Sequence, residues 1–143
     1  MFKYLLAVDE SENATRAAHY LANLTRLRKD LDITVVHVVN FKKEINKIAN
    51  SSTEISEIEK EAIERGWQIL DEQTADFDKL GVAIKKQLIN GNPGNKITEF
   101  AKLNDFTHIV LGSRGLTNLQ GLVMGSVSHR VLHQAHCPVT LVK

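Results

Sequence analysis

The sequence predicts an α/β domain built on a parallel sheet that is covered by helices on both faces. Short apolar runs alternate with longer amphipathic stretches from one end of the 143 residues to the other. The apolar runs contain many β-branched residues and little alternation, which is typical of strands buried on both faces. Most of the stretches between them have helical periodicity, and helical connections between successive strands make the strands parallel.

Five apolar runs are expected to form the strands. The first ends at an aspartate, and the second reads Ile-Thr-Val-Val-His-Val-Val, a strongly β-branched segment. The predicted strands cover residues 2–8, 33–39, 82–89, 107–111 and 138–142.

The helices are predicted from their start signals and apolar stripes. Ser11 is a suitable N-cap, Asn92-Pro93 places proline at a first helical position, and Gly81 marks a helix end. Residues 40–52 have no clean period, so we expect an irregular connection there. The predicted helices run over residues 11–28 and 53–79, from residue 93 onward, and over residues 125–135.

Composition narrows the class of protein. The net charge is +1 with 43% hydrophobic and 24% charged residues, so a nucleic-acid binder with a strong basic excess is not expected. No apolar stretch approaches the ~18 residues that cross a bilayer. Cys137 is the single cysteine, which excludes an internal disulfide and fits a reducing cytoplasm. We expect one soluble cytoplasmic domain spanning residues 1–143, because no composition break or repeat divides the chain.

The loop after the fourth predicted strand carries the most chemical information. In a doubly wound sheet, ligands bind beyond the carboxyl ends of the strands. Gly112 and Gly115 would let backbone N–H groups approach an anion, and Gly125-Ser126 would place further N–H groups at a helix start that favours phosphate. Ser126 and Ser128 add hydroxyl donors, and Arg114 could balance charge.

A simpler interpretation is a glycine-rich connection that only turns the chain. The loop is not a Walker A loop, because no Gly-Lys-Ser/Thr ends it. It is also not a G-x-G-x-x-G fingerprint opening a helix after the first strand. From the residues alone, both a phosphate site and a plain connection remain open.

Several segments together resemble the universal stress protein family, in its ATP-binding branch. The spacing Gly-x2-Gly-x9-Gly-Ser is similar to the ATP-binding signature of that family. Further matches are Ala-Val-Asp-Glu-Ser after the first strand, Val-His-Val-Val in the second, Gly-Asn-Pro before the third helix and Cys-Pro-Val entering the last strand. The likeness covers essentially the whole chain.

The resemblance implies an open sheet of order 3-2-1-4-5 and an ATP site at its carboxyl edge. Asp9 would accept hydrogen bonds from the ribose, the backbone at Ala7 and Val38 would hold adenine, and a Mg or Mn ion would bind through the phosphates. The phosphates would lie against residues 112–118 and the start of the last helix, namely Gly112, Ser113, Arg114, Gly115, Leu116, Thr117, Asn118, Gly125, Ser126, Val127 and Ser128.

The last strand, residues 139–142, would be an unprotected apolar sheet edge. The resemblance implies antiparallel pairing of two copies there, so we expect a homodimer.

Other titratable residues favour no further site. His129 and His133 are four apart on a predicted helix, near His136 and Cys137, yet no acidic residue accompanies them, so no metal site is expected. His37 and His108 fall in strands, and Trp67 falls in the long helix as a packing residue.

Two functions use the predicted cleft. The first is an ATP-binding regulatory or stress-response protein, and the second is a slow ATP hydrolase or nucleotide-dependent enzyme. The loop offers anion donors but no evident base or phosphate-directed lysine, so we name no catalytic residue. A signalling receiver would need an aspartate where Ile89-Asn90 stands, and a flavin phosphate would meet Asp9 and Glu10.

Overall fold

The computed structural model describes residues 1–48, 52–114 and 124–143. Its centre is a five-stranded sheet in the order β3-β2-β1-β4-β5, and every strand pair is parallel. This architecture confirms the predicted fold class and strand order. The strands are β1 (Phe2–Ala7), β2 (Leu31–Val39), β3 (Lys85–Asn90), β4 (His108–Gly112) and β5 (Val139–Val142).

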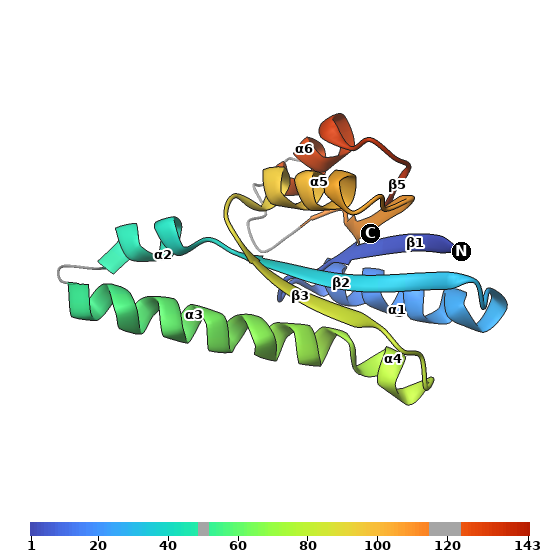
Figure 1. Cartoon of the computed structure of the whole chain (residues 1–143), viewed down its shortest axis with the longest axis horizontal. Helices are drawn as coiled ribbons and strands as arrows, with labels where there is room; N and C mark the ends of the chain where they lie inside the picture. Colours follow the sequence, from blue (N-terminus) through green and yellow to red (C-terminus); the bar gives the residue numbers. More distant parts are fainter. Residues whose placement is uncertain (49–51, 115–123) are drawn as a thin grey trace.

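Helices cover both faces of the sheet (Figure 1). One face carries α1, α3 and α4, and the other carries α5 and α6, while α2 and the start of α3 extend past the end of the sheet. The helices are α1 (Glu12–Leu27), α2 (Phe41–Ile48), α3 (Ser52–Gln73), α4 (Ala75–Lys79), α5 (Pro93–Leu103) and α6 (Ser126–Gln134).

The alternation of side chains along each strand divides the core into two layers. Leu6 and Val35 pack in the layer that contains residues of α1, α3 and α4. Their neighbours Leu5 and Val36 pack in the other layer, with residues of α5 and α6. Both faces of the central strands are therefore buried, which explains why their sequences are continuously apolar rather than alternating.

The predicted helix starts at Ser11 and Asn92 are confirmed. The Ser11 hydroxyl accepts a hydrogen bond from the Ala14 N–H at 3.1 Å, and the Asn92 side chain accepts one from the Asn95 N–H at 3.3 Å. Both caps lie at the carboxyl edge of the sheet, so they set where the following helices begin relative to the loops.

The prediction of an irregular connection over residues 40–52 was wrong, because α2 occupies most of it. The Asn40 side chain accepts a hydrogen bond from the Lys43 N–H, and the Asn90 side chain accepts one from the Phe41 N–H. Asn90 ends β3, so a contact across 49 residues supports the start of α2. A local periodicity search cannot detect such a contact.

The predicted helix over residues 53–79 is two helices that divide at Thr74. Thr74 is fully buried, and its hydroxyl donates to the Leu70 carbonyl at 2.7 Å. The redirected chain then places Phe77 in the core. The third strand begins at Lys85 rather than at residue 82, although Val82 and Ile84 still pack against the core.

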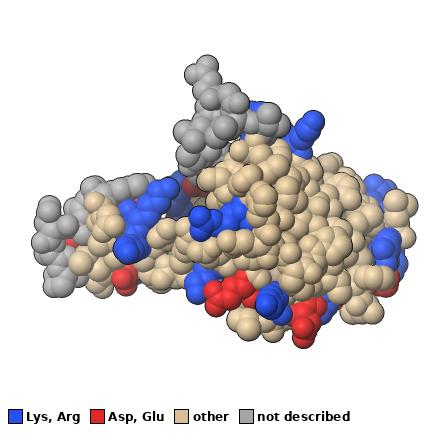
Figure 2. Space-filling view, turned by 90° about the horizontal axis from the view of Figure 1, so that it is seen from above, with Lys and Arg blue, Asp and Glu red and all other residues tan. Residues whose placement is uncertain are grey.

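Trp67 is not the packing residue that the sequence predicted. It remains 42% exposed on α3, beside Ile63 at 40%. On the face in Figure 2, basic and acidic side chains are interspersed rather than gathered into one basic surface. None of the described helices has the length and apolarity needed to cross a membrane.

Candidate functional site

The carboxyl ends of β1, β2 and β4 open into a cavity of about 790 Å³. A ligand site is expected at this position because the strand order reverses between β1 and β4. The connection after β1 leads to β2 on one side, and the connection after β4 leads to β5 on the other. The cavity is of ordinary size for a small-molecule site. Residues of the loop after β1, the loop after β4, and the helices α2, α3, α5 and α6 form its walls.

The loop after β1 is held in one shape by its own side chains. The Asp9 carboxylate accepts a hydrogen bond from the Ser11 N–H at 2.8 Å, and Ser11 in turn caps α1. The Asp9 carbonyl accepts a hydrogen bond from the Gln73 side chain of α3 at 2.7 Å. Asp9 therefore lies at the cavity wall on a turn that hydrogen bonds hold in place. Its carboxylate can accept further hydrogen bonds from a ligand.

The ends of β1 and β2 supply the apolar part of the cavity. Ala7 and Val38 belong to the core layer of α5 and α6, and both line the cavity. On the opposite face, His37 Nδ1 lies 2.7 Å from the Val8 carbonyl. Because a carbonyl only accepts, this contact assigns the proton to Nδ1 in the neutral ring. The bond also holds the peptide that precedes Asp9.

Gly112 lies where β4 meets the start of α1. A Cβ at this position would come within 2.8 Å of both the main-chain carbon and the Cβ of Asn13. Real Cβ atoms essentially never approach that closely, so the glycine is required by the packing of α1 against β4. The same close packing brings the Asp9–Asn13 segment against the wall formed by Gly112 and Arg114.

The start of α6 presents main-chain donors to the cavity. Gly125 is the N-cap residue, and no side chain caps the helix there. The N–H groups of Ser126, Val127 and Ser128 come before the first bond within the helix, from His129 to the Gly125 carbonyl. All four residues from Gly125 to Ser128 line the cavity. They form a site with the chemistry to receive an anion.

Helices α2 and α3 add charged residues to the cavity wall that the sequence analysis did not identify. Arg65 of α3 donates to both carboxylate oxygens of Glu10, with distances of 2.5 and 2.6 Å from Nη2. Hydrogen bonding to Glu10 raises the pKa of the Arg65 guanidinium above its ordinary value. Lys43 and Glu61 lie on the same wall. The Arg65–Glu10 contact joins residues 55 apart, so no local pattern could have indicated it.

Comparison with known proteins decides which family this arrangement belongs to. The sequence model of the universal stress protein family matches residues 1–143. The chain belongs to the universal stress protein family.

Two relatives support the same assignment across the whole chain. Universal stress protein MJ0531 of Methanocaldococcus jannaschii is 33% identical over 142 residues, which cover 99% of this chain and 81% of the relative. Universal stress protein YxiE of Bacillus subtilis is 30% identical over 149 residues, which cover 99% of this chain and 98% of the relative.

Solved structures share the fold. Protein MJ0577 of Methanocaldococcus jannaschii aligns with a TM-score of 0.85 at 23% identity, over 99% of this chain and 94% of its own. A universal stress protein from Archaeoglobus fulgidus, solved in complex with dAMP, aligns with a TM-score of 0.72 at 24% identity, over 100% and 98% of the chains. One from Arabidopsis thaliana, with AMP bound, aligns with a TM-score of 0.72 at 23% identity, over 100% and 92%.

In this universal stress protein, most of the predicted site residues that the structure describes meet at one cavity. Ser113 does not line it, because its side chain accepts a hydrogen bond from Asn13 instead. Gly115, Leu116, Thr117 and Asn118 lie outside the described residues. The predicted residues on the cavity wall are Ala7, Asp9, Val38, Gly112, Arg114, Gly125, Ser126, Val127 and Ser128.

The Ser128 hydroxyl has a partner within the protein. Ser128 is buried, and its Oγ donates to the Gly112 carbonyl at 2.7 Å. This bond fastens the first turn of α6 to the end of β4. It leaves the main-chain N–H of Ser128, rather than its hydroxyl proton, available to a ligand.

The histidines near the end of the chain do not converge with Cys137. The rings of His129 and His133 contact each other at a centroid distance of 4.4 Å, while His136 Nε2 lies 3.0 Å from the Phe106 carbonyl. Within residues 1–48, 52–114 and 124–143, no group of at least three His, Cys, Asp or Glu residues is arranged to hold a metal ion.

Proposed function

We propose that this universal stress protein is an ATP-binding regulatory protein with one nucleotide site per domain of residues 1–143. The observation that carries the proposal is the uncapped start of α6, which opens into the same cavity as the Asp9 carboxylate. The helix start has the chemistry to bind the phosphates of a nucleotide, and the nearby carboxylate has the chemistry to bind its ribose hydroxyls.

The proposed pose follows the walls of the cavity. The adenine lies against the ends of β1 and β2, with the main chain at Ala7 and Val38 as its partner, and Asp9 accepts from the ribose hydroxyls. The phosphates lie against residues 112–118 and the N–H groups of Ser126, Val127 and Ser128. Each hydrogen bond to a charged phosphate contributes about 1.5–3 kcal/mol, so a few of them support micromolar binding.

A Mg or Mn ion in this proposal is bound mainly through phosphate oxygens. The described part of the cavity has scattered carboxylates but no set of three metal ligands. That donor set fits an ion that keeps waters and phosphate ligands, as Mg²⁺ prefers, rather than one enclosed by protein side chains.

The solved relatives support the ligand class. The Archaeoglobus fulgidus protein was solved with dAMP and the Arabidopsis thaliana protein with AMP, so adenine nucleotides are the class to test first. ATP, rather than a monophosphate, is our proposal because the helix start and the Gly-x2-Gly-x9-Gly-Ser spacing provide more main-chain donors than one phosphate needs.

The proposal includes a homodimer that forms through β5. This strand lies at the edge of the sheet, and all its residues are partly exposed. An apolar edge with unpaired main-chain groups is a template for a second strand. We further propose that the protein acts in the cytoplasm, in line with its single cysteine.

Identification of the bound ligand tests the proposed function. The protein is purified without added nucleotide, denatured, and the released small molecules are identified by mass spectrometry. Titration calorimetry then compares ATP, AMP and GTP, each with and without Mg²⁺. Binding of ATP in the micromolar range, tighter than AMP, supports the proposal. A released flavin, or no binding of any adenine nucleotide, would overturn it.

A further inference from the structure

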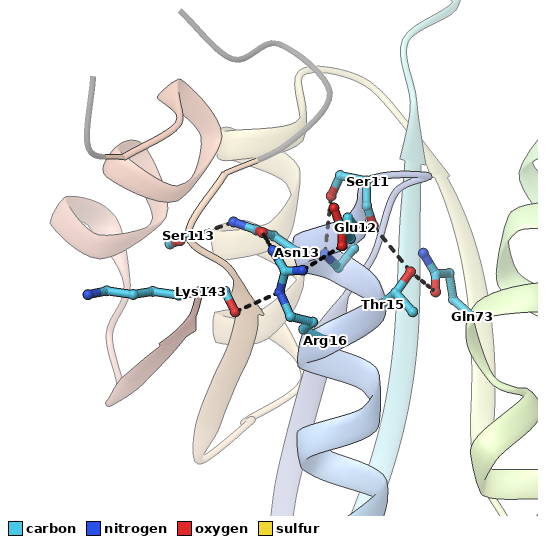
Figure 3. Close-up of polar contacts among 9 residues, drawn as sticks. Ser11, Glu12, Asn13, Thr15, Arg16, Gln73, Ser113 and Lys143 are labelled. Atoms are coloured by element: carbon cyan, nitrogen blue, oxygen red, sulfur yellow. Dashed lines mark hydrogen bonds and ion pairs between the residues drawn. The ribbon is translucent and has the colours of Figure 1, made fainter. Parts of the chain in front are cut away.

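Ser113 links the proposed nucleotide site to two other elements, and the inference drawn from it rests on the proposed function. Its neighbours Gly112 and Arg114 both line the cavity, but its own side chain is turned away from it. The Ser113 Oγ accepts a hydrogen bond from Asn13 Nδ2 at 3.2 Å (Figure 3). The side chain therefore faces α1, while its neighbours form part of the cavity wall.

The main chain of Ser113 is also bonded on both sides. Its N–H donates to the Val142 carbonyl of β5 at 2.8 Å, and its carbonyl accepts from the Gly125 N–H at 2.8 Å. Gly125 is the N-cap of α6, the helix whose start is the proposed phosphate site. Ser113 is therefore bonded at once to β5 and to the start of α6.

Asn13 extends this connection to Arg16. Arg16 Nη2 donates to Asn13 Oδ1 at 2.5 Å, and Arg16 Nε donates to the main-chain carbonyl of Lys143 at 2.9 Å (Figure 3). Glu12 holds the same guanidinium with an ion pair of 2.8 Å. The planar guanidinium has several donors in fixed directions, so it can keep these partners at once.

Lys143 directly follows the last residue of β5, and its carbonyl is held by Arg16. Main-chain groups of alternate residues point to opposite sides of a strand. The carbonyls of Pro138 and Val142 accept from Ile109 and Ser113, on the side of β4. Arg16 binds the residue directly after Val142, so its contact with Lys143 fixes the end of this edge strand.

We propose that Asn13 and Arg16 are positioning residues that couple nucleotide binding in the cavity to pairing of the β5 edge with a second copy of the chain. Nucleotide binding orders the Gly112–Arg114 wall, and the Ser113–Asn13–Arg16 contacts pass that order to the end of β5. An edge that is already ordered loses less conformational entropy when it pairs. ATP therefore strengthens the dimer, and by linkage dimerisation strengthens ATP binding by the same factor.

The test measures how ATP changes the dimer dissociation constant, by analytical ultracentrifugation with and without ATP and Mg²⁺. For the unchanged protein we expect ATP to tighten the dimer at least about fivefold, the lower end of common coupling factors. In Asn13→Ala and Arg16→Gln we expect this ratio to fall to near one, while calorimetric ATP affinity of the monomer stays within about threefold. Arg26→Gln, in the last turn of the same helix, serves as the matched control and keeps the full ratio.

The use of a ratio removes any direct effect of a variant on the dimer itself. Asn13→Ala breaks the contact without touching β5, so it remains informative if Arg16→Gln loses stability. Amide hydrogen exchange of residues 139–143 provides a second measurement, with ATP-dependent protection expected in the unchanged protein and lost in both variants.

Separate outcomes overturn the inference and the proposed function. If ATP binds but leaves the dimer constant and the exchange of β5 unchanged, the coupling is wrong and the nucleotide site stands. If both variants keep the full ATP effect, Asn13 and Arg16 do not carry the coupling. If ATP does not bind at all in the titration, the proposed function fails, and the inference fails with it.

Discussion

At the scale of single residues, Gly112 can be explained by two separate requirements, anion binding and close packing of α1 against β4. Its sequence context suggests a glycine that lets main-chain N–H groups approach an anion. In the structure, the position is also the point where β4 touches the start of α1, with no room for a Cβ. Packing alone would retain this glycine, so its presence is weaker evidence for a phosphate than the spacing suggested.

We predict that Gly112→Ala lowers both stability and ATP affinity. The added Cβ must push Asn13 away, and overpacking of this kind costs about 1–3 kcal/mol. The clash also displaces the main chain of Gly112, which lines the cavity, so ATP affinity should fall as well. Chemical denaturation and calorimetry measure the two effects.

Gly81→Ala is the matched control for this change. Gly81 has a φ of +67° with open space around its Cβ position, so alanine there costs about 1–2 kcal/mol through the backbone alone. We expect normal ATP affinity in this control. A Gly112→Ala variant that binds ATP normally would show that the wall does not contact the ligand.

We predict that Asp9→Ala weakens ATP binding by at least about tenfold and inorganic triphosphate binding by less than about threefold. The reason is that the proposed partner of Asp9 is the ribose, which triphosphate lacks. Calorimetric titration with both ligands measures the difference. Because Asp9 also accepts from the Ser11 N–H, Ser11→Ala is the control for a loosened α1 start. Equal losses for both ligands would contradict the assignment of Asp9.

At the scale of elements, a carboxylate introduced at the start of α6 is expected to change stability and ATP binding in opposite directions. Gly125 has no capping side chain, and an aspartate at an N-cap accepts from the first N–H groups of the helix. The same N–H groups are the proposed donors to phosphate. A carboxylate at this position therefore satisfies the helix and repels the ligand.

We predict that Gly125→Asp abolishes measurable ATP binding while the melting temperature stays equal or rises. A Ser126→Asp variant should lose ATP binding in the same way. Calorimetry and thermal denaturation provide the two readouts, and Leu132→Asp, on the exposed face of the same helix, controls for the added charge. Near-normal ATP affinity in Gly125→Asp would contradict the proposed phosphate site at the start of α6.

We predict that Leu141→Lys gives a monomer at concentrations where the unchanged protein is a dimer. Leu141 lies in the middle of β5 and is partly exposed at the sheet edge. A lysine there adds a charge next to the same charge on the paired copy and removes apolar contact, a common way to block edge pairing. Light scattering over a concentration series decides the matter, and a dimer that persists would place the interface elsewhere.

At the scale of the whole molecule, the donors that the described walls of the cavity offer favour binding of the proposed ATP over its fast hydrolysis. The proposed phosphate donors are fixed main-chain N–H groups, which hold ground-state phosphate about as well as a transition state, and such uniform binding gives affinity without rate. Asp9, a conceivable base, belongs to the ribose end of the proposed pose.

We predict that single-turnover hydrolysis of labelled ATP with Mg²⁺ is far slower than the ~1–100 s⁻¹ of dedicated phosphoryl-transfer enzymes. A rate above about 1 s⁻¹ that disappears in Arg114→Ala or Asp9→Asn would make this protein an enzyme. The same rate in both variants and the unchanged protein would point to a contaminating ATPase, which the proposed function survives.

The sequence by itself determined the class of fold, the strand order through its family resemblance, and most of the cavity wall. These features depend on local signals: apolar runs, helix caps at Ser11 and Asn92, and glycine spacing. Because parallel strands bring all their carboxyl ends to one edge, placing each strand also places the loop that follows it. That is why Asp9, Val38 and Gly125 meet at one cavity as predicted.

Only the tertiary structure decided the features that depend on contacts between distant segments. Asn90 supports the start of α2, Arg65 pairs with Glu10, and Ser113 faces Asn13 rather than the cavity. The direction of a side chain at the end of a strand is set by what packs against it, not by the residues beside it. The sequence therefore predicted which loops border the cavity, and packing decided which side chains turn into it.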